Sequence, residues 1–329
     1  MSRRSSRATR SPSAPPPSGS SPSAGPISTG RTGVESAVTE TAPGDVPAPL
    51  AVEVACADDV GGREEQQDRV AVFHSDDEAL LVVADGLGGH RDGARASAEV
   101  VATAEEVWQG LDRPFDSADT LLEHIRDRAH ERIHSFGEGL PSPPMSTCAL
   151  LYIAGRRAFW VHVGDSRLYH FRRGEVMSRT RDHSLAQVLY DRGEITETEM
   201  ATRPEQAQLL SALGGEDVPH AESGGADLEA GDGFLLCSDG LWEVIRTEEM
   251  WEALVAGDLP AAAAGLAGLA AERGGPTGDN VAVALARLRD PQAEDTVGLM
   301  AGVGALLTAP IRLTRALNRR LRPKPKGGR

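Results

Sequence analysis

The sequence predicts a mixed α+β fold with a sheet that is at least partly antiparallel. Short apolar runs rich in Val and Leu are typical of buried strands, and longer segments with helical spacing alternate with them. Turn sequences at residues 154–157 and 172–175 join consecutive runs as hairpins, which makes neighbouring strands antiparallel. With 329 residues, 40% hydrophobic content and only 4% aromatic residues, we expect a sizeable core built from Ala, Val and Leu.

The first half of the folded part contains most of the expected strands and two long helices. Strands are expected at residues 51–55, 70–73, 80–84, 145–153, 158–163 and 168–171. Residues 93–111 place apolar side chains three or four positions apart, as one face of a helix requires, and residues 121–136 do the same. Glycine-rich turns separate these elements, so each is bounded by its own stop signal.

The second half begins with a polar insertion at residues 180–217, which we expect to lie over one edge of the body. Within it, residues 184–192 suggest a helix, and Thr196 with Glu199 three positions later is typical of a helix cap. Beyond the insertion, the expected elements are a strand at 234–237, helices at 248–254 and 260–272, and a strand at 281–285.

Composition divides the chain into a folded part and two tails. Residues 1–48 are rich in Ser and Pro with few large apolar side chains, which predicts disorder, and residues 49–290 have the composition of a globular domain. Residues 291–329 contain a weakly apolar piece, 297–309, followed by the basic segment 312–329. That piece is shorter than the roughly 20 residues of a membrane span. We favour a solvated tail, with weak peripheral membrane contact or an anionic partner as the alternative.

Charge and cysteine content exclude several classes of protein. The formal net charge is −15, and residues 49–290 hold 21 bases against 44 acids, so nucleic acid is an unfavourable partner and cations are favourable ones. The cysteines are Cys56, Cys148 and Cys237, which we expect to be reduced core residues of a cytoplasmic protein. None is followed six residues later by Arg, which excludes a cysteine-based phosphatase.

A strand-end aspartate occurs twice in the sequence. The apolar run at residues 80–84 leads into Asp85-Gly86, and the run at 234–237 leads through Ser238 into Asp239-Gly240. One Asp-Gly pair usually marks only a turn. A carboxylate at the end of a buried strand is costly unless it has a partner, and a divalent cation is such a partner. The repetition therefore favours a metal site.

Further side chains fit the same site. Asp68, Asp165 and Asp279 also lie where a loop meets a strand. Carboxylate oxygens suit hard cations such as Mg²⁺ or Mn²⁺, and two such ions lower the pKa of a shared water enough to attack phosphorus near neutral pH. Arg63, in the loop before Asp68, could hold phosphate oxygens in bidentate fashion.

A series of short motifs, each weak alone, occurs in a specific order along residues 50–290. They are Arg63-x-x-Gln66-Gln67-Asp68, Ala84-Asp85-Gly86-Leu87-Gly88-Gly89-His90, Ser146-Thr147, Gly164-Asp165-Ser166-Arg167-Leu168-Tyr169, Asp182-His183-Ser184, Ala212-Leu213-Gly214, Ser238-Asp239-Gly240-Leu241 and Gly278-Asp279-Asn280. As an ordered set they resemble the metal-dependent Ser/Thr protein phosphatases of the PPM (PP2C) family in their bacterial form.

The resemblance implies a fold and an activity. The fold would be a four-layer α-β-β-α sandwich with two central antiparallel sheets, in which residues 180–217 form a flap that shapes substrate access. The activity would be hydrolysis of phosphoserine and phosphothreonine on proteins, by in-line attack of a hydroxide that bridges two Mn²⁺ or Mg²⁺ ions. Such an enzyme would oppose a Ser/Thr kinase in cytoplasmic signalling.

The resemblance also implies a set of metal ligands. Asp85 would bridge the two ions and the carbonyl of Gly86 would bind the second. Asp239 and Asp279 would hold the first ion. Asp165, with Asp239, would form a looser third position.

The remaining site residues would act on water and substrate. Asp68 would act through metal-bound water, and Arg63 would bind the substrate phosphate. Eukaryotic members place a proposed general acid, a His, where this chain has Leu87. His90 is nearby and is the candidate that could replace it, although a structural histidine fits this position equally well.

Three other interpretations remain open. The main alternative is a catalytically inactive regulator of the same fold that binds phosphoproteins, for which lost metal ligands would be the mark. Another is a phosphatase specialised as an anti-sigma-factor regulator. The third reads residues 86–89 as a nucleotide cradle, but the spacing of a known phosphate-binding fingerprint is missing.

Overall fold

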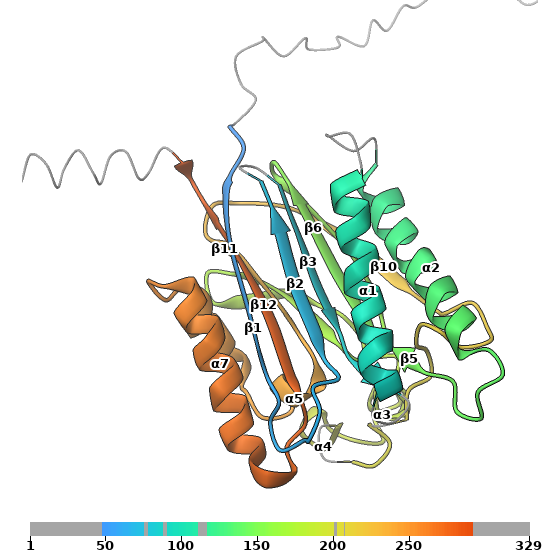
Figure 1. Cartoon of the computed structure of the whole chain (residues 1–329). Coiled ribbons are helices and arrows are strands. Elements are labelled where there is room, and N and C mark those ends of the chain that lie inside the picture. Colours follow the sequence, from blue (N-terminus) through green and yellow to red (C-terminus); the bar gives the residue numbers. More distant parts are fainter. Residues whose placement is uncertain are drawn as a thin grey trace, which may run out of the picture. The chain divides into compact units, whose positions relative to one another are not determined.

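The computed structural model describes residues 48–75, 78–87, 91–110, 117–200, 203–206 and 208–291 (Figure 1). The tails predicted at 1–48 and 291–329 lie outside these ranges except for Ala48 and Pro291, and His90 also lies outside them. Within the described part, no helix is both long and apolar enough to cross a membrane.

Two five-stranded antiparallel sheets form the centre of the fold. The first has the order β1 (Ala51–Asp59), β12 (Val281–Arg289), β11 (Asp232–Cys237), β8 (Arg167–Arg172), β9 (Glu175–Arg179). The second has the order β10 (Glu222–Asp227), β7 (Arg157–Val163), β6 (Cys148–Ala154), β3 (Glu78–Ala84), β2 (Arg69–His74). Two short strands, β4 (Gly86–Leu87) and β5 (Met145–Ser146), pair beside them.

Strand β3 illustrates why the apolar runs become central strands. All seven of its residues are buried. Successive side chains of a strand point to opposite faces. Leu80 and Val82 therefore join the core under the helices, while Leu81 and Val83 join the core between the sheets. A strand covered on both faces needs an uninterrupted apolar sequence, which is what residues 79–84 of this segment have.

Helices cover the outer face of each sheet. Helices α1 (Arg91–Gly110) and α2 (Ala118–Gly137) pack on the sheet that contains β3 and β6 (Figure 1). Helices α5 (Asp239–Trp242), α6 (Thr247–Leu254) and α7 (Leu259–Gly274) pack on the other sheet, and a 3₁₀ turn, η1 (Gly275–Thr277), follows α7. The result is the predicted α-β-β-α sandwich, and the fold class is confirmed.

Local capping explains where the longer helices begin. The Ser117 side chain accepts a hydrogen bond from the Thr120 amide at 3.5 Å at the start of α2. Asp258 accepts one from the Ala261 amide at 2.9 Å at the start of α7. Each cap satisfies a backbone donor that the first helical turn leaves without a partner.

The structure differs from the sequence-based expectation at several elements. The run expected as one strand at 145–153 is interrupted at Thr147, because that residue binds the Asp85 backbone instead of continuing the sheet. Strand β10 was not expected, since its polar, glycine-containing sequence lacks strand periodicity, and it pairs only with β7 at the sheet edge. Cys56 is exposed on β1, so its predicted core position is wrong, while Cys148 and Cys237 are buried.

The insertion at residues 180–217, called the flap below, contains α3 (Leu185–Asp191) and α4 (Glu197–Met200). Ala186, Ile195 and Met200 form a small apolar cluster within it. The predicted cap at Thr196 is confirmed, because its amide donates to Glu199 Oε2 at 2.8 Å and the Glu199 amide donates back to Thr196 Oγ1 at 3.4 Å.

Backbone hydrogen bonds tie the flap to the strand ends that carry the site. The Leu210 amide donates to the His183 carbonyl at 2.7 Å, and the His183 amide donates to the Gly164 carbonyl at 2.9 Å. The Leu213 amide donates to the Ser146 carbonyl at 2.8 Å. The flap is thus connected to the segments beside Asp165 and beside Asp85.

Candidate metal centre

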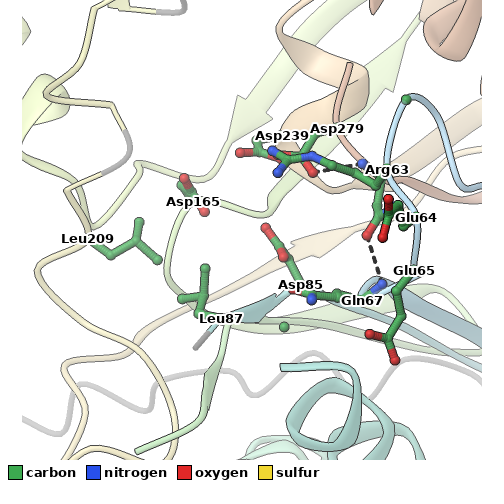
Figure 2. A pocket seen from close by; sticks show the side chains of 13 residues that line it. Arg63, Glu64, Glu65, Gln67, Asp85, Leu87, Asp165, Leu209, Asp239 and Asp279 are labelled. Carbon is green, nitrogen blue, oxygen red and sulfur yellow. Dashed lines mark hydrogen bonds and ion pairs between the residues drawn. The ribbon is translucent and has the colours of Figure 1, made fainter. Parts of the chain in front are cut away.

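An open cavity of about 550 Å³ lies at the ends of the central strands (Figure 2). Its lining includes four of the five expected aspartates, all but Asp68. The lining residues are Gly62, Arg63, Glu64, Glu65, Gln67, Asp85, Gly86, Leu87, Asp165, Leu209, Asp239, Asp279 and Asn280. The two strand-end Asp-Gly pairs, distant in sequence, meet here. The structure therefore brings together the expected candidates Arg63, Asp85, Gly86, Asp165, Asp239 and Asp279.

Asp85 is fixed through its backbone at the end of β3. Its amide donates to Thr147 Oγ1 at 2.9 Å, and its carbonyl accepts from the Thr147 amide at 2.9 Å and from Ser146 Oγ at 3.0 Å. The carboxylate is left to point into the cavity (Figure 2). At Gly86, a Cβ would lie 2.1 Å from the Gly93 carbonyl oxygen, so only glycine fits this close approach.

Asp239 and Asp279 lie next to each other in the cavity, and Leu87 lies on its opposite side (Figure 2). Asp239 is the first residue of α5, and Asp279 lies just before β12, the neighbour of β11. The backbones approach closely, since a Cβ at Gly240 would lie 2.1 Å from the Asn280 carbonyl oxygen. Adjacent strand ends therefore place both carboxylates at one edge of the sheet.

Asn280 fastens the loops that carry Arg63 and Asp279. Its Nδ2 donates to the Val60 carbonyl at 2.8 Å, and its Oδ1 accepts from the Gln67 amide at 2.7 Å. Arg63 Nη2 donates to Asp279 Oδ2 at 2.7 Å, with 54% and 39% of the two side chains exposed. Arg63 is the only Arg or Lys among the described residues that line the cavity.

Asp165 approaches the centre from the loop between β7 and β8. The residue is 3% exposed, and the indole Nε1 of Trp242 donates to its carbonyl at 3.0 Å. Its Oδ2 accepts a hydrogen bond from Gln206 Nε2 at 3.2 Å, and the same amide reaches Asp239 Oδ2 at 3.3 Å. A flap side chain therefore bridges two of the expected metal ligands.

Burial and mutual repulsion make these carboxylates hard to ionise. Burial first, then neighbouring carboxylates including Asp68 and Asp239, raises the pKa of Asp85 well above its usual value. Burial and the charge of Asp239 do the same to the pKa of Asp165. Burial and Asp279 raise the pKa of Asp239 to about 6. Such a cluster needs positive charge to ionise fully at neutral pH.

The donor set fits divalent cations of the Mg²⁺ and Mn²⁺ class. Four carboxylates and the backbone of Gly86, which lines the cavity, supply hard oxygen ligands. The described lining contains neither the thiolates nor the imidazoles that Zn²⁺ sites commonly use. The cavity also leaves room for the waters that Mg²⁺ retains.

Asp68 is the one expected ligand that does not line the cavity. It is 2% exposed, and its Oδ2 accepts a hydrogen bond from Ser238 Oγ at 2.6 Å. Burial raises the pKa of Asp68 to about 8. The hydrogen bond from Ser238 lowers this pKa, and the charges of Asp239 and Asp279 raise it further. Asp68 therefore lies behind the residues that line the cavity. This position suits a carboxylate that contacts a metal through a water molecule.

Several residues near the centre were not anticipated from the sequence. Burial, with the charges of Asp239 and Asp279, raises the pKa of Glu243 to about 8. Its position four residues after Asp239 is a helical spacing that could have drawn attention to it. Glu64 and Glu65 line the cavity beside Arg63, where adjacency to Arg63 was the available signal. Gln206 had no local signal.

A second group of potential ligands combines the flap residue His183 with His162 of β7 and Glu222 of β10. The hydrogen bonds of the imidazoles argue against a metal there. His183 Nδ1 accepts from the Gly164 amide at 3.2 Å, so the neutral ring carries its proton on Nε2 and neither nitrogen offers a free lone pair to a metal. Burial and the neighbouring His162 lower the pKa of His183 to about 3, which keeps it neutral. A neutral, hydrogen-bonded ring is what a structural histidine requires.

Sequence relatives of this chain are bacterial phosphatases. The serine/threonine protein phosphatase PstP of Mycobacterium tuberculosis is 34% identical over 225 residues, which is 68% of this chain but 43% of PstP. The chain thus spans less than half the length of that relative. The protein phosphatase PhpP of Streptococcus pneumoniae is 32% identical over 251 residues, covering 74% of this chain and 100% of PhpP.

Structural similarity and the family match agree with these relatives. The catalytic domain of PstP, solved in complex with two manganese ions, superposes with a TM-score of 0.63 at 33% identity, covering 73% of this chain and 100% of that one. The family model described as protein phosphatase 2C matches residues 62–262. Together with the sandwich fold and the carboxylate-lined cavity, this match shows that the chain belongs to the protein phosphatase 2C family.

Proposed function

We propose that this chain is a metal-dependent protein phosphatase that hydrolyses phosphoserine and phosphothreonine on proteins. The observation that carries the proposal is the convergence of Asp85, Asp165, Asp239 and Asp279 with Arg63 in one open cavity. Clusters of buried carboxylates are typical of sites that bind divalent cations, and a neighbouring guanidinium can bind a phosphate group. The relatives named as Ser/Thr phosphatases support the same reaction.

The proposed metal ligands are Asp85 and the Gly86 carbonyl, together with Asp239 and Asp279, for two Mn²⁺ or Mg²⁺ ions. Asp165 with Asp239 would hold a third, looser ion. When bound, such ions lower the pKa of water and neutralise charge on the phosphate. The manganese complex of PstP supports the first two positions by similarity.

The other residues orient water and substrate in this proposal. Arg63, half exposed at the mouth, receives the phosphate oxygens. Asp68, hydrogen-bonded to Ser238, acts on the water bound at the centre by accepting or holding a proton. The flap covers the approach to Asp165, and its Leu209 lines the cavity, so it contacts the protein substrate. His90 stays a sequence-based prediction for the leaving-group acid.

The setting that we propose is a cytoplasmic Ser/Thr kinase pathway, in which the chain removes what the kinase adds. The tails would lie outside the catalytic domain of residues 49–290, and the basic C-terminal segment would contact at most an anionic surface or partner. Deleting residues 291–329 should leave hydrolysis of a short phosphopeptide unchanged.

The decisive experiment is hydrolysis of a phosphothreonine peptide with EDTA, Mg²⁺ or Mn²⁺, for wild type and Asp239→Asn. We expect turnover only with metal, and its collapse in the variant, because Asp239 would serve two cation positions. A folded wild-type protein that binds Mn²⁺ yet releases no phosphate would refute the enzyme and favour a phosphoprotein-binding regulator.

A further inference from the structure

A second open cavity, of about 460 Å³, lies at the far end of the strands that carry the carboxylates, and we call it the strand-end groove. Its walls are the turn before β11, the C-terminal end of α6 and the last residues of β12. Strands β11 and β12 connect the two sites (Figure 1): each has one end two residues from Asp239 or Asp279 and the other end at the groove. The nine residues of β12 span roughly 25–30 Å, so the groove is remote from the metal centre.

The strand-end groove is lined by apolar side chains that are open to solvent on one side. Val255, just after α6, is 53% exposed. Leu254 and Leu288 line the groove from below and are 1% exposed each, and Trp251 lines it beside them. At Gly231 a Cβ would have no atom of the described residues within 4 Å, so the hollow is open there. An exposed apolar hollow of this kind is typical of a binding surface.

Hydrogen bonds from Arg287 hold the walls of the groove in place. Its Nη1 donates to the carbonyls of Ala256 and, at 3.4 Å, of Leu254, at the end of α6. Its Nη2 donates to Glu53 Oε2 on β1 at 2.6 Å. Arg287 thus links the helix end to two strands and satisfies carbonyls that the last helical turn leaves without partners. The groove is therefore preformed, and a ligand can enter without rearranging it.

The chain itself supplies an apolar segment at this place. Asp290, which lines the groove, is the last residue before Pro291, where the described part of the chain ends. Residues 296–311 follow and contain no charged side chain. The six residues 291–296 reach at most about 20 Å when extended, which is enough to reverse direction and return to the groove.

The sequence of this segment has a face that suits an apolar groove. Leu299, Val303 and Leu306 recur at the spacing of one helical face, while glycine and alanine occupy most of the other positions. A short segment with several glycines is a weak helix by itself and gains from a surface that covers its apolar face. The groove offers such a surface directly beside the point where the segment is attached.

We propose that the strand-end groove binds the chain's own segment 297–309, with Leu299, Val303 and Leu306 covering Val255 and Trp251. This inference goes beyond the proposed phosphatase activity and replaces the solvated tail that composition alone favours. Both apolar surfaces leave water when they meet, and the short tether raises the effective concentration of the segment to about the millimolar range. Docking here leaves the metal centre open and fixes the point from which the basic segment 312–329 extends.

Thermolysin, which cleaves before large apolar residues, tests the docking in the full chain. Cleavage within residues 297–309, followed by mass spectrometry, should be on the order of tenfold faster in Val255→Asp than in wild type. A carboxylate in the groove disfavours the apolar contact, and proteolysis tracks the undocked fraction. Leu140→Asp is the matched control, because Leu140 is 41% exposed just after α2, on the other helical layer. It should leave the cleavage rate unchanged.

Variants in the tail carry the test without altering the folded domain. Trp251 lines the groove, so its fluorescence should shift to longer wavelength in Val303→Asp, which removes the apolar contact. Ala301→Asp, on the opposite side of the helical spacing, should keep the wild-type emission. In a Trp251→Phe background the two tail variants should give the same emission.

Equal thermolysin cleavage in wild type and Val255→Asp, or a Val303→Asp emission equal to that of wild type, would overturn the inference. Protection that is lost on dilution would assign the groove to the tail of a second copy. Protection that requires vesicles with anionic lipids would assign the segment to a membrane surface. Either result would also overturn it. Phosphopeptide turnover, which we expect to be unchanged in all these variants, reports separately on the proposed function.

Discussion

The Arg63 guanidinium and the Asp279 carboxylate form an ion pair of 2.7 Å at the mouth of the acidic cavity. Both side chains are substantially exposed, so the pair itself contributes little to stability. Its importance is positional: it holds a planar, permanently charged donor over carboxylates that otherwise repel an anionic substrate. An arginine in this place lets a phosphate enter a cavity whose other charged lining groups are acidic.

Replacing Arg63 with Ala should lower kcat/KM for a phosphothreonine peptide between about tenfold and a hundredfold. A hydrogen bond to a charged group contributes about 1.5–3 kcal/mol, which corresponds to that range. Steady-state kinetics at saturating Mn²⁺ measure the effect. Arg63→Lys should recover only part, since it keeps the charge without the fork. Arg157, another exposed ion-paired arginine, provides the control, and equal losses from Arg157→Ala would refute a specific role.

Ser238→Ala should lower the free energy of unfolding by about 1–3 kcal/mol, the cost of leaving buried polar groups without partners. Ser238 Oγ donates to Asp68 at 2.6 Å and accepts from the Ala282 amide at 2.9 Å, so two buried partners lose a bond. Urea unfolding in EDTA measures the change. Ser223→Ala, at an exposed position of β10, should change it by less than about 0.5 kcal/mol.

The metal-free protein should become less stable as the pH rises from about 4 to about 8. Burial raises the pKa of Asp68 to about 8 and that of Asp239 to about 6, both above the usual value of 3.8. The folded state then binds more protons than the unfolded state in this window, so the free energy of unfolding falls with pH. Urea unfolding in EDTA between pH 5 and pH 8 tests this.

Two comparisons make that pH test specific. Asp68→Asn removes the group with the higher of the two values, so the decline above pH 6 should flatten. Saturating Mn²⁺ should abolish or reverse the decline, because cations bind the ionised carboxylates. A stability that rises with pH in EDTA would mean that other groups, such as the Arg172-paired Asp232, whose pKa is lowered, dominate the balance.

The strands and site residues that could be predicted from the sequence are those whose own short segments have a recognisable pattern. β3 and β11 contain uninterrupted apolar runs, residues 79–84 and 234–237, because both of their faces are covered, and Asp85 and Asp239 stand out just beyond them. The four layers came from the resemblance, and the order of the strands was not predicted, since strand pairing between distant segments has no local signal. Arg63 was proposed as a phosphate ligand from its place in the loop before Asp68, and the resemblance implied the same role.

What the sequence hid depends on tertiary contacts. Gln206 is one polar residue in a polar stretch, and only folding brings it to Asp165 and Asp239. β10 has no apolar alternation because one edge pairing with β7 suffices to hold it. Thr147 interrupts an apolar run because its hydroxyl and amide are used by the Asp85 backbone. Each exception sits beside the centre or at an edge.

Asp182→Asn should destabilise the protein by about 3–5 kcal/mol. Arg167 donates from Nη2 to Asp182 Oδ2 at 2.7 Å and from Nε to Oδ1 at 2.9 Å, and the two side chains are 6% and 1% exposed. The variant leaves the guanidinium, which stacks 3.5 Å over the Trp242 ring, without its counter-charge in a buried site. Thermal or urea unfolding measures the loss.

The exposed pair Arg157–Asp227 is the comparison for that prediction, with 63% and 94% of its side chains accessible. Asp227→Asn should change the free energy of unfolding by no more than about 1 kcal/mol, because solvent screens the pair. Similar effects of the two substitutions would contradict the role assigned to burial of the Arg167–Asp182 pair.

The cavity mouth predicts a charge preference in the substrate. Glu64 and Glu65 lie beside Arg63 on one side of the carboxylates, while Leu87 and Leu209 lie on the other (Figure 2). A phosphopeptide with Lys or Arg beside the phosphothreonine should therefore have a lower KM than its acidic counterpart. Exposed ion pairs contribute about 0.2–1 kcal/mol each, so we expect a few-fold difference per charge, reduced by added salt.

Glu64→Lys with Glu65→Lys should reverse that preference through KM while kcat stays nearly constant, because neither residue is a proposed ligand of the centre. Hydrolysis of p-nitrophenyl phosphate, which has no flanking residues, should be far less affected and reports on the chemistry alone. If both peptides keep their wild-type KM ratio in the double variant, the acidic wall does not contact the substrate. The peptide would then have to cross the cavity on the side of Leu87 and Leu209, where apolar substitutions in the peptide would change KM instead.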